Sequence, residues 1–431
     1  MQRLLKLKLR LLARMYLRRY KPAIVAVTGN TGKTSTKEAI GAVLGARWET
    51  RVPQGNLNNE FGVPLAILGG WDKEYYDRGS SLWFWAKVLF SSFFRFLFWM
   101  KYPEILVLEY GADHPGDIKK LVQAYPPHIG VVTTVGDIPV HIEYFKNADA
   151  MAKEKSELVQ VLKPADFAVL NRDDERVFAM SETTKAKVLS YGFNERAKVR
   201  VSDFEYRVDS EGIPLGVTFK LHHEGSFIPV NINGSLGKSQ AWAAAAGAAV
   251  GLATGLNLVQ ISQAMSGYQG PKGRLKIIKG LNDSTMIDDT YNASPASMSL
   301  ALDVLKELPA IRKIAVLGDM LELGEHTISA HREMGEKVSG TADMLVCIGL
   351  RAKFIAESAL ETRLLSEEQV LSFDTSEEAA QKLPGLIRRH DLVLVKSSQG
   401  IRTEKIVKAI MADPSQASKL LVRQSKKWLS K

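Results

Sequence analysis

The chain of 431 residues is too long for one hydrophobic core and fits two or three domains. Its apolar content of 45% and charged content of 24% are those of an ordinary globular protein. The net charge of +10 comes from the two ends: residues 1–21 carry eight basic groups and residues 414–431 carry five, both without an acid, which leaves −3 for residues 22–413. The body therefore lacks the basic patch of a nucleic-acid-binding protein, and we expect no nucleic-acid partner.

The chain has one cysteine, Cys347, in the apolar run from Met344 to Ile348. A lone thiol in such a run behaves as a small buried apolar side chain. It can form no disulfide within the chain, and no cysteine cluster is present to hold zinc. Both facts favour a reducing, cytoplasmic location.

Residues 4–19 predict a basic amphipathic helix. One face is expected to carry Leu4, Leu5, Leu7, Leu11, Leu12 and Met15, and the other Arg3, Lys6, Arg10 and Arg14. The segment lacks the continuous apolar core of a secretory signal. Two interpretations stay open: a helix packed on the body with a solvated basic face, or a helix lying on anionic lipid.

A phosphate-binding loop is predicted directly after this helix. The apolar residues Ile24 to Val27 predict a buried strand, and Ser35 to Leu44 have helix composition. Backbone amides in such a turn, with the positive end of a helix behind them, form a cradle for phosphate oxygens. We expect the cradle to consist of Gly29, Asn30, Thr31, Gly32, Lys33, Thr34 and Ser35. Its spacing is the short G-x-x-G-K-T, so a plain strand-to-helix turn is the alternative.

Residues 82–100 form an aromatic-rich segment with three tryptophans and six phenylalanines. On a helix, Lys87, Ser91 and Arg95 would form one narrow polar stripe. Two charges in mid-segment argue against a transmembrane span and favour a helix lying in the plane of the membrane surface. The alternative is a core helix or a dimer seam, which would also hide so much aromatic surface.

The rest of the chain predicts an α/β fold. Apolar strands at 105–108, 129–133 and 167–170 alternate with helical stretches, which is typical of a mainly parallel sheet with helices on its faces. Residues 198–233 predict an antiparallel edge extension, and residues 239–253 an alanine-rich helix. After a hinge at 269–273, a second α/β unit has predicted strands near 284–288, 312–317, 344–348 and 391–395.

The order of five motifs resembles the Mur ligase family, whose members build the peptide stem of cell-wall precursors. After the phosphate loop come the runs 56–65, 106–118, 288–295 and 316–324, and the resemblance extends from about Ala23 to about Ile410. The nearest branch adds D-alanyl-D-alanine to a UDP-muramoyl tripeptide. The resemblance implies a central P-loop ATPase domain with a mainly parallel sheet and a C-terminal Rossmann-like domain.

Four divisions of the chain follow. Residues 1–22 are the basic helix, and residues 23–269 the central ATP-binding domain with the aromatic insertion at about 80–101. Residues 270–412 are the C-terminal domain and residues 413–431 a basic tail. The separate N-terminal UDP-binding domain of the family is expected to be missing, because only some two dozen residues precede the phosphate loop.

The chemistry of amide-bond formation assigns roles to several residues. The γ-phosphate of ATP converts a carboxylate into an acyl phosphate, which an amine then attacks. Lys33 would neutralise the phosphates, while Thr34 and Glu109 are suitable oxygen ligands for a first Mg²⁺. Glu109 ends a buried strand, where a carboxylate is costly unless it meets a cation.

The resemblance implies the remaining roles. His141 corresponds to a histidine on a second Mg²⁺, and Lys155 to a lysine whose carbamylated form is an oxygen ligand. Arg274 corresponds to an arginine that reaches ATP across the hinge, and Asp289 to an acid on its ribose. The substrate side comprises Asn58, Asn59, Tyr291, Asn292 and Lys396.

The chain departs from the family pattern in three places. Residues 236–240 replace the His-Asn-x-x-Asn that contacts adenine, where Gln240 could stand for the last asparagine. Ser294 and the run Lys396-Ser397-Ser398-Gln399 also differ, both where the incoming dipeptide is recognised. The expected activity is therefore an ATP- and Mg²⁺-dependent amide ligase that joins an amino acid or a dipeptide to a muramyl-peptide-like carboxylate.

Two alternatives stay open. One is a membrane-associated scaffold of the same fold with weak or no catalysis. The other is an amidating ligase acting on a lipid-linked precursor, although that branch carries a four-cysteine zinc ribbon and this chain has one cysteine. We expect a monomer or weak dimer, on the cytoplasmic side, with an anionic membrane surface as a partner of the two unusual helices.

Overall fold

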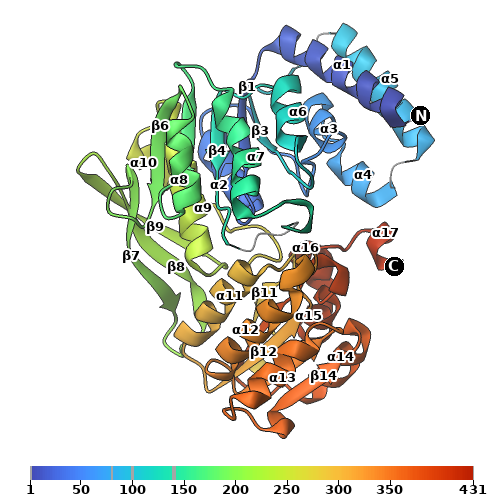
Figure 1. The fold of residues 1–431 in the computed structure, drawn as a ribbon, viewed down its shortest axis with the longest axis vertical. Coiled ribbons are helices and arrows are strands. Elements are labelled where there is room, and N and C mark those ends of the chain that lie inside the picture. The colour runs from blue at the N-terminus through green and yellow to red at the C-terminus, as the bar shows by residue number, and fades with distance from the viewer. Residues whose placement is uncertain (1, 79–80, 99–100, 138–141, 431) are drawn as a thin grey trace.

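The computed structural model describes residues 2–78, 81–98, 101–137 and 142–430. Two twisted sheets lie one above the other with helices on their faces (Figure 1). The first has the strand order β2-β3-β1-β4-β5-β6-β7-β8-β9 and the second β10-β11-β15-β12-β13-β14. The α/β fold class predicted from the sequence is confirmed.

The strands of the first sheet are β1 (Ala23–Thr28), β2 (Thr50–Arg51), β3 (Ile105–Glu109), β4 (Ile129–Val132), β5 (Phe167–Asn171), β6 (Lys187–Gly192), β7 (Val199–Val208), β8 (Pro214–His223) and β9 (Ser226–Asn233). Those of the second are β10 (Lys276–Lys279), β11 (Thr285–Asp289), β12 (Arg312–Gly318), β13 (Met344–Ile348), β14 (Val370–Phe373) and β15 (Asp391–Lys396).

The helices associated with the first sheet are α1 (Gln2–Tyr20), α2 (Lys33–Gly45), α3 (Gly62–Leu68), α4 (Asp72–Arg78), α5 (Leu82–Leu97), α6 (Asp117–Ala124), α7 (Ala148–Gln160), α8 (Glu175–Phe178), α9 (Lys238–Ala253) and α10 (Leu258–Met265). Those that follow are α11 (Pro295–Glu307), α12 (Thr327–Ser339), α13 (Lys353–Glu361), α14 (Ser376–Lys382), α15 (Glu404–Ile410), α16 (Ala417–Leu420) and α17 (Lys426–Leu429).

The position of β1 determines where a ligand can bind. This buried strand pairs in parallel with β3 on one side and β4 on the other, so the strand order reverses at β1. In open parallel sheets the crevice beyond the carboxyl ends of strands at such a reversal is the usual ligand site. The loop after β1 and the end of β3 both open into that crevice.

Helix α2, which begins at the crevice, is held in place by close packing against α9. The alanine-rich α9 is buried along most of its length. A Cβ atom at Gly247 would lie 3.2 Å from the backbone of Ala39 in α2, so glycine allows the two helices to approach. The predicted alanine-rich helix is confirmed, and it supports the phosphate-loop helix from behind.

The antiparallel extension predicted at 198–233 is also confirmed. Strands β7, β8 and β9 pair as antiparallel neighbours, and β6 joins them in parallel to the rest of the sheet. In the second sheet the four predicted strands correspond to β11, β12, β13 and β15, all parallel. The short edge strands β10 and β14 were not predicted. The domain limits at 22, 269 and 412 stay predictions.

The N-terminal helix packs on the body with a different face from the expected one. The buried side chains of α1 are Leu9, Leu12, Ala13 and Tyr16. Of the six apolar residues predicted to share one face, four are exposed: Leu4, Leu7, Leu11 and Met15. The helix therefore has two apolar faces, and the basic residues lie between them. Within the described ranges, no helix is long and apolar enough to cross a membrane.

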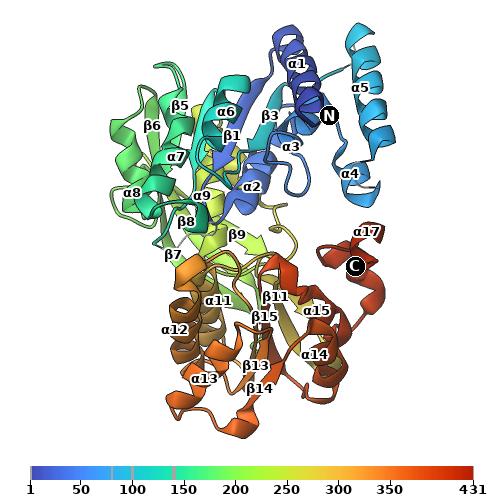
Figure 2. The ribbon, with the colours of Figure 1, turned by 45° about the vertical axis from the view of Figure 1, so that its right-hand side comes forward.

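The C-terminal segment, predicted as a basic tail, packs against the body. Ala417 and Leu421 are buried in the core of the second sheet. The chain then crosses to the first sheet, where α17 contacts α4 (Figure 2). The Ser425 hydroxyl donates to the backbone carbonyl of Tyr76 at 3.2 Å. Residues 417–429 therefore connect the two sheets beside the crevice.

Candidate functional site

One cavity lies at the carboxyl ends of β1 and β3 and is closed by the second sheet. Its first wall consists of Gly29, Asn30, Thr31, Gly32, Lys33, Thr34, Asn56, Asn58, Glu109, Gly111, Ala112, Asp113 and Lys155. Its second wall consists of Arg274, Tyr291, Asn292, Ala293, Ser294 and Ser297. The structure therefore brings together most of the residues that were predicted as site residues from distant parts of the sequence.

The loop after β1 has the backbone that a phosphate cradle needs. Gly29 has φ +140° and Gly32, at the start of α2, has φ +86°, both disfavoured for other residues. A Cβ atom at Gly29 would lie 1.9 Å from the Thr133 hydroxyl. That hydroxyl, directly after β4, donates to the Thr31 carbonyl at 2.7 Å and so holds the loop after β1 in place.

The Lys33 ammonium lies inside this loop. It donates to the carbonyls of Gly29 and Asn30, each at 3.0 Å. Burial lowers the pKa of Lys33, and the nearby Glu109 carboxylate partly opposes that effect. The lysine is thus held at the head of α2, directed at the cavity that Glu109 also lines.

Glu109 is a buried carboxylate with an unusual set of neighbours. It is 2% exposed, and the register of the sheet places it beside Val27 at the end of β1. The Thr34 hydroxyl lies 3.2 Å from one carboxylate oxygen, and the Asn58 amide donates to the other at 3.2 Å. A hydroxyl and a carboxylate at this spacing match the oxygen ligands that Mg²⁺ prefers.

The described residues contain no group of three or more His, Cys, Asp or Glu side chains that could hold a metal by themselves. Mg²⁺ commonly binds through one or two protein oxygens together with substrate phosphates and water, so Thr34 and Glu109 fit that mode.

Lys155 lies in the same cavity on α7. The helix is anchored by Glu154, whose carboxylate accepts from the Gly116 and Ile118 amides at 2.7 and 2.8 Å. The Lys155 side chain is 2% exposed and makes no hydrogen bond to any residue in the described part of the chain. Burial, followed by the nearby charge of Lys33, lowers the pKa of Lys155 to about 7. Much of this amine is therefore neutral at physiological pH.

The second wall of the cavity is built around Arg274 and Tyr291. The Arg274 guanidinium lies 4.1 Å from the centroid of the Tyr291 ring. Arg423, in the C-terminal segment, holds the loop that carries Tyr291. The guanidinium of Arg423 donates to the carbonyls of Thr290 and, at 3.1 Å, Tyr291, and it pairs with Glu404 at 2.8 Å.

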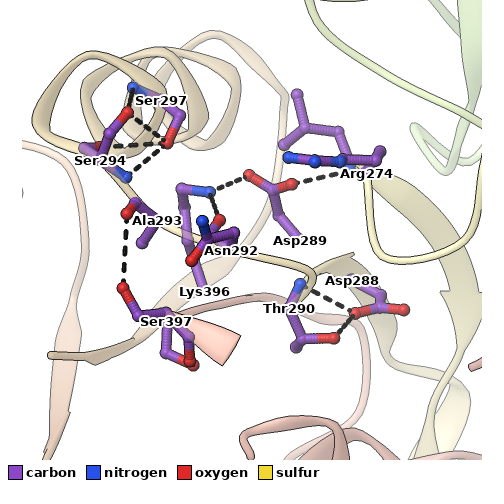
Figure 3. Close-up of polar contacts among 12 residues, drawn as sticks. Arg274, Asp288, Asp289, Thr290, Asn292, Ala293, Ser294, Ser297, Lys396 and Ser397 are labelled. Carbon is purple, nitrogen blue, oxygen red and sulfur yellow. Dashed lines mark hydrogen bonds and ion pairs between the residues drawn. The ribbon is translucent and has the colours of Figure 1, made fainter. Parts of the chain in front are cut away.

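Asp289 and Lys396 form a buried ion pair behind this wall (Figure 3). Their charged atoms are 2.6 Å apart, and the Lys396 ammonium also donates to the Asn292 carbonyl at 2.9 Å. Burial lowers the pKa of Lys396, whereas Asp289 opposes that shift. Neither side chain lines the cavity, so the structure places these two predicted residues behind the site, where they hold the Asn292 loop.

Three other predicted residues also lie outside the cavity lining. Asn59 accepts from the Phe61 and Gly62 amides at 3.1 and 3.0 Å, which orders the start of α3. Ser35 is buried, and its carbonyl accepts from the Tyr268 hydroxyl at 3.1 Å. Gln240 is fully buried and donates to the Arg274 carbonyl at 3.2 Å. His141, predicted on a second Mg²⁺, lies outside the described residues.

Asn56, Asp113 and Ser297 line the cavity without a predicted role. Asn56 and Asp113 lie inside the quoted motifs, which is the signal that could have found them. Ser294, predicted as a departure from the family pattern where the dipeptide is recognised, also lines the cavity. Arg423 had no such signal, because its basic surroundings are typical of a solvated tail.

A second cavity of about 820 Å³ adjoins the first, since Thr31 and Gly32 line both. Thr36, Asn171, Asp173, Ser239, Trp242 and Ser299 also line it. The Trp242 indole donates to Asp173 at 2.6 Å. The site thus combines a phosphate cradle with a larger adjoining space, as expected for an enzyme that transfers the phosphoryl group of a nucleotide.

Comparisons with known proteins agree with this class. Residues 94–250 match the Mur ligase middle domain, and residues 273–399 match the family described as Mur ligase, glutamate ligase domain. The chain is 30% identical to a UDP-N-acetylmuramoyl-tripeptide–D-alanyl-D-alanine ligase of Mycobacterium tuberculosis, covering 90% of this chain and 73% of that protein. It is 29% identical to the Bacillus subtilis ligase of the same name, covering 94% and 79%.

Solved structures lead to the same family. The MurF ligase of Thermotoga maritima in complex with ADP superimposes with a TM-score of 0.76 at 27% identity, covering 93% of this chain and 82% of that one. A MurF from Acinetobacter baumannii gives 0.74 at 27% identity, covering 93% and 79%. The chain belongs to the Mur ligase family of ATP-dependent amide ligases.

Because there is no room for a side chain at Gly29, a substitution there tests the proposed nucleotide site directly. We expect Gly29→Ala to reduce ATP affinity at least tenfold in calorimetric titration, because the new methyl group collides with Thr133 and reshapes the cradle. Gly267→Ala is the matched control, since nothing lies within 4 Å of a Cβ atom there. Unchanged ATP affinity in a folded Gly29→Ala protein would contradict the assignment of this loop.

Proposed function

We propose that the chain joins D-alanyl-D-alanine, or an amine of similar size, to the terminal carboxyl group of a muramyl peptide. The observation that carries the proposal is the convergence of Lys33, Thr34 and Glu109 from the first sheet with Arg274 from the second on one cavity. The relatives named above as ligases of D-alanyl-D-alanine and UDP-N-acetylmuramoyl tripeptide support the choice of substrates.

The reaction has two steps. A carboxylate oxygen of the acceptor attacks the γ-phosphorus of ATP and ADP leaves, which gives an acyl phosphate. The amine nitrogen then attacks the acyl carbon, phosphate leaves with the bonding electrons and the amine loses a proton. In this scheme Lys33 and the loop amides bind the phosphates, while Arg274 brings a second positive charge from the opposite wall. Closing the two walls excludes water, which would hydrolyse the acyl phosphate.

Thr34 and Glu109 are the proposed protein ligands of a first Mg²⁺. The ion supplies charge neutralisation for the transferring phosphoryl group. Asn58 orients Glu109 by donating to its second oxygen, which leaves the oxygen beside Thr34 to face the cation. His141 and a modified Lys155 are the proposed ligands of a second ion, and both assignments rest on the family resemblance.

Lys155 fits the proposed carbamylation because its amine is buried and partly neutral. Only a neutral amine attacks carbon dioxide, and the nitrogen loses one proton as the carbamate forms. A pKa of about 7 places a large fraction of Lys155 in that form near neutral pH. The product replaces a cation with an anionic oxygen ligand beside Lys33, which removes the repulsion between the two lysines.

The second cavity is the proposed place of the adenosine. It begins at Thr31 and Gly32 of the proposed phosphate cradle, and Trp242 and Asn171 are among its lining residues. Residues 236–240 depart from the family pattern, and the buried Gln240 is already bonded to the Arg274 carbonyl and the Tyr268 hydroxyl. We therefore assign base recognition to the walls of this cavity instead of Gln240.

The acceptor is proposed to be presented at the cytoplasmic face of the cell membrane. The support is the pair of helices α1 and α5, which lie at one end of the molecule (Figure 2). Both expose apolar side chains, and α1 also exposes basic ones. An acceptor held at a membrane surface and one carried on a soluble UDP-sugar present the same carboxyl group. They differ in how the enzyme finds it.

Replacement of Lys33 separates an enzyme from a silent scaffold. We expect phosphate release that depends on both a muramyl tripeptide and D-alanyl-D-alanine to fall about 100-fold or more in Lys33→Ala, since one charge on the phosphates is lost. Lys119→Ala, which removes an exposed lysine of α6, should keep full activity. Equal turnover by wild type and Lys33→Ala would refute the proposed chemistry.

The carbamate makes activity depend on carbon dioxide and pH. We expect buffer freed of carbon dioxide to lower turnover, and bicarbonate to restore it. The restoration should strengthen as pH rises through about 7, because the neutral amine of Lys155 then dominates. Labelled bicarbonate should give a carbamate carbon signal in the NMR spectrum of wild type and of Lys153→Ala, an exposed neighbour on α7, but not of Lys155→Ala. Carbon-dioxide-independent turnover would contradict this assignment.

A further inference from the structure

The outward face of α1 is apolar. Leu4, Leu7, Leu11 and Met15 are between 39% and 57% exposed and lie opposite the buried residues Leu9, Leu12, Ala13 and Tyr16. Positions 4, 7, 11 and 15 share one side of a helix because their spacings are three or four residues. A surface helix with one core face normally has a polar outer face. This helix instead offers a second apolar stripe to whatever surrounds the protein.

The aromatic helix α5 has the same arrangement. It is anchored through Phe84, Trp85, Val88 and Ser92, which are buried. Its outer face carries Leu82, Trp83, Phe90, Phe93, Phe94, Leu97 and, at its end, Phe98. Trp83 is 81% exposed and Phe90 67%. The two charges of the segment are exposed but contact the body: Lys87 pairs with Glu74 at 2.8 Å, and Arg95 lies over Trp71.

The two helices form one structural unit. The Tyr16 hydroxyl donates to the Ser92 carbonyl at 2.6 Å, and the Arg19 guanidinium donates to the Phe96 carbonyl. They lie together at the end of the molecule remote from the second sheet (Figures 1 and 2). We call the exposed apolar side chains of both helices, with the basic residues beside them, the α1–α5 surface.

The concentration of apolar side chains is not that of an ordinary solvated surface. Of the 22 large apolar side chains that are exposed in the described part of the chain, 11 belong to the α1–α5 surface. Exposed apolar patches of this kind mark sites of association with a partner or a membrane. The remaining 11 are spread over the other elements and need no explanation.

Charge decides between the two kinds of occupant. Residues 2–21 carry eight basic groups and no acid, of which Arg3, Lys8, Arg10 and Arg18 are exposed without an ion-pair partner within the described residues. Two copies joined through this face would bring like charges together at close range. An anionic bilayer instead attracts the charges and accepts the leucine, phenylalanine and tryptophan side chains at headgroup depth.

We propose that the α1–α5 surface binds an anionic lipid bilayer, with the outward stripes of both helices inserted among the headgroups and the basic residues on lipid phosphates. This inference does not depend on the ligase reaction, because it concerns a surface that shares no residue with the cavity.

The α1–α5 surface is also connected to the loop at residues 56–61. Lys6 of α1 pairs with Glu60 at 2.5 Å and lies 5.0 Å from the centroid of the Phe61 ring. These residues end the loop whose Asn56 and Asn58 line the cavity. The bilayer-binding surface is therefore linked through Lys6 to the cavity wall that carries Asn56 and Asn58. If the proposed function holds, the acceptor carboxyl group enters the cavity along this wall.

Sedimentation with vesicles tests the surface without ATP or substrate. Vesicles of phosphatidylcholine with about one-third phosphatidylglycerol should bind the full chain, and binding should weaken at high salt because screening removes the electrostatic attraction. Trp83→Ser combined with Phe90→Ser should lower the partition coefficient at least tenfold. Ile311→Ser combined with Leu350→Ser, which removes two equally exposed apolar side chains elsewhere, should leave it unchanged.

A charge-matched pair of variants tests the basic component. The combined variant Arg3→Gln, Lys8→Gln, Arg10→Gln and Arg18→Gln should bind vesicles at least tenfold more weakly. The control variant Lys119→Gln, Lys163→Gln, Lys185→Gln and Lys408→Gln removes the same charge at exposed positions elsewhere and should have little effect. Equal binding by both variants would overturn the proposal. So would the absence of vesicle binding together with a dimer in solution that Trp83→Ser and Phe90→Ser dissociate, because a second copy would then cover the surface.

Discussion

The buried carboxylate of Glu109 is the constraint on which the site depends. A charged group that is 2% exposed costs several kcal/mol unless polar partners and a cation compensate it. The protein supplies the partners through Thr34 and Asn58. The pairing of β3 with β1 places Glu109 beside Val27, at the carboxyl end of β1 from which the loop to Thr34 begins. We propose that Mg²⁺ and Lys33 supply the positive charge, so that the residues that satisfy Glu109 would also bind the phosphates of ATP.

The second sheet completes the site only if it is held against the first. Arg274 and Tyr291 form the facing wall, and the ion pair of Asp289 with Lys396 fixes the loop behind them. The C-terminal segment also connects the two sheets. Arg423 donates to the loop of Tyr291 on the second sheet, and Ser425 donates to Tyr76 of α4 on the first. At least one basic residue of this segment, Arg423, therefore serves packing and is not a solvated charge.

Much of the fold could be predicted because the relevant signals are local. Buried strands such as β1 and β12 are short continuous apolar runs. The phosphate loop is recognised by glycine, lysine and threonine at fixed spacing. Lys33, Thr34 and Glu109 were predicted from their own neighbours, and the structure brings them together.

The side-chain contacts that could not be predicted are those between residues far apart in the sequence. Lys396 and Asp289 are separated by more than 100 residues, and pairing between neighbouring strands turns both away from the cavity. Arg423 is buried by a loop 132 residues away. The face by which α1 packs could not be chosen from its own pattern, because leucines occupy both sides of that helix and the core of the first sheet selects Leu9, Leu12 and Tyr16.

The central claim is that the acceptor carboxylate is activated by phosphoryl transfer from ATP. The most direct measurement uses an acceptor with ¹⁸O in its terminal carboxyl group and follows the label by mass spectrometry. Attack on the γ-phosphorus carries one carboxyl oxygen into the acyl phosphate, and the amine then releases it with phosphate. One ¹⁸O atom in the released phosphate for each amide bond formed is the predicted result; unlabelled phosphate alongside amide formation would contradict the account.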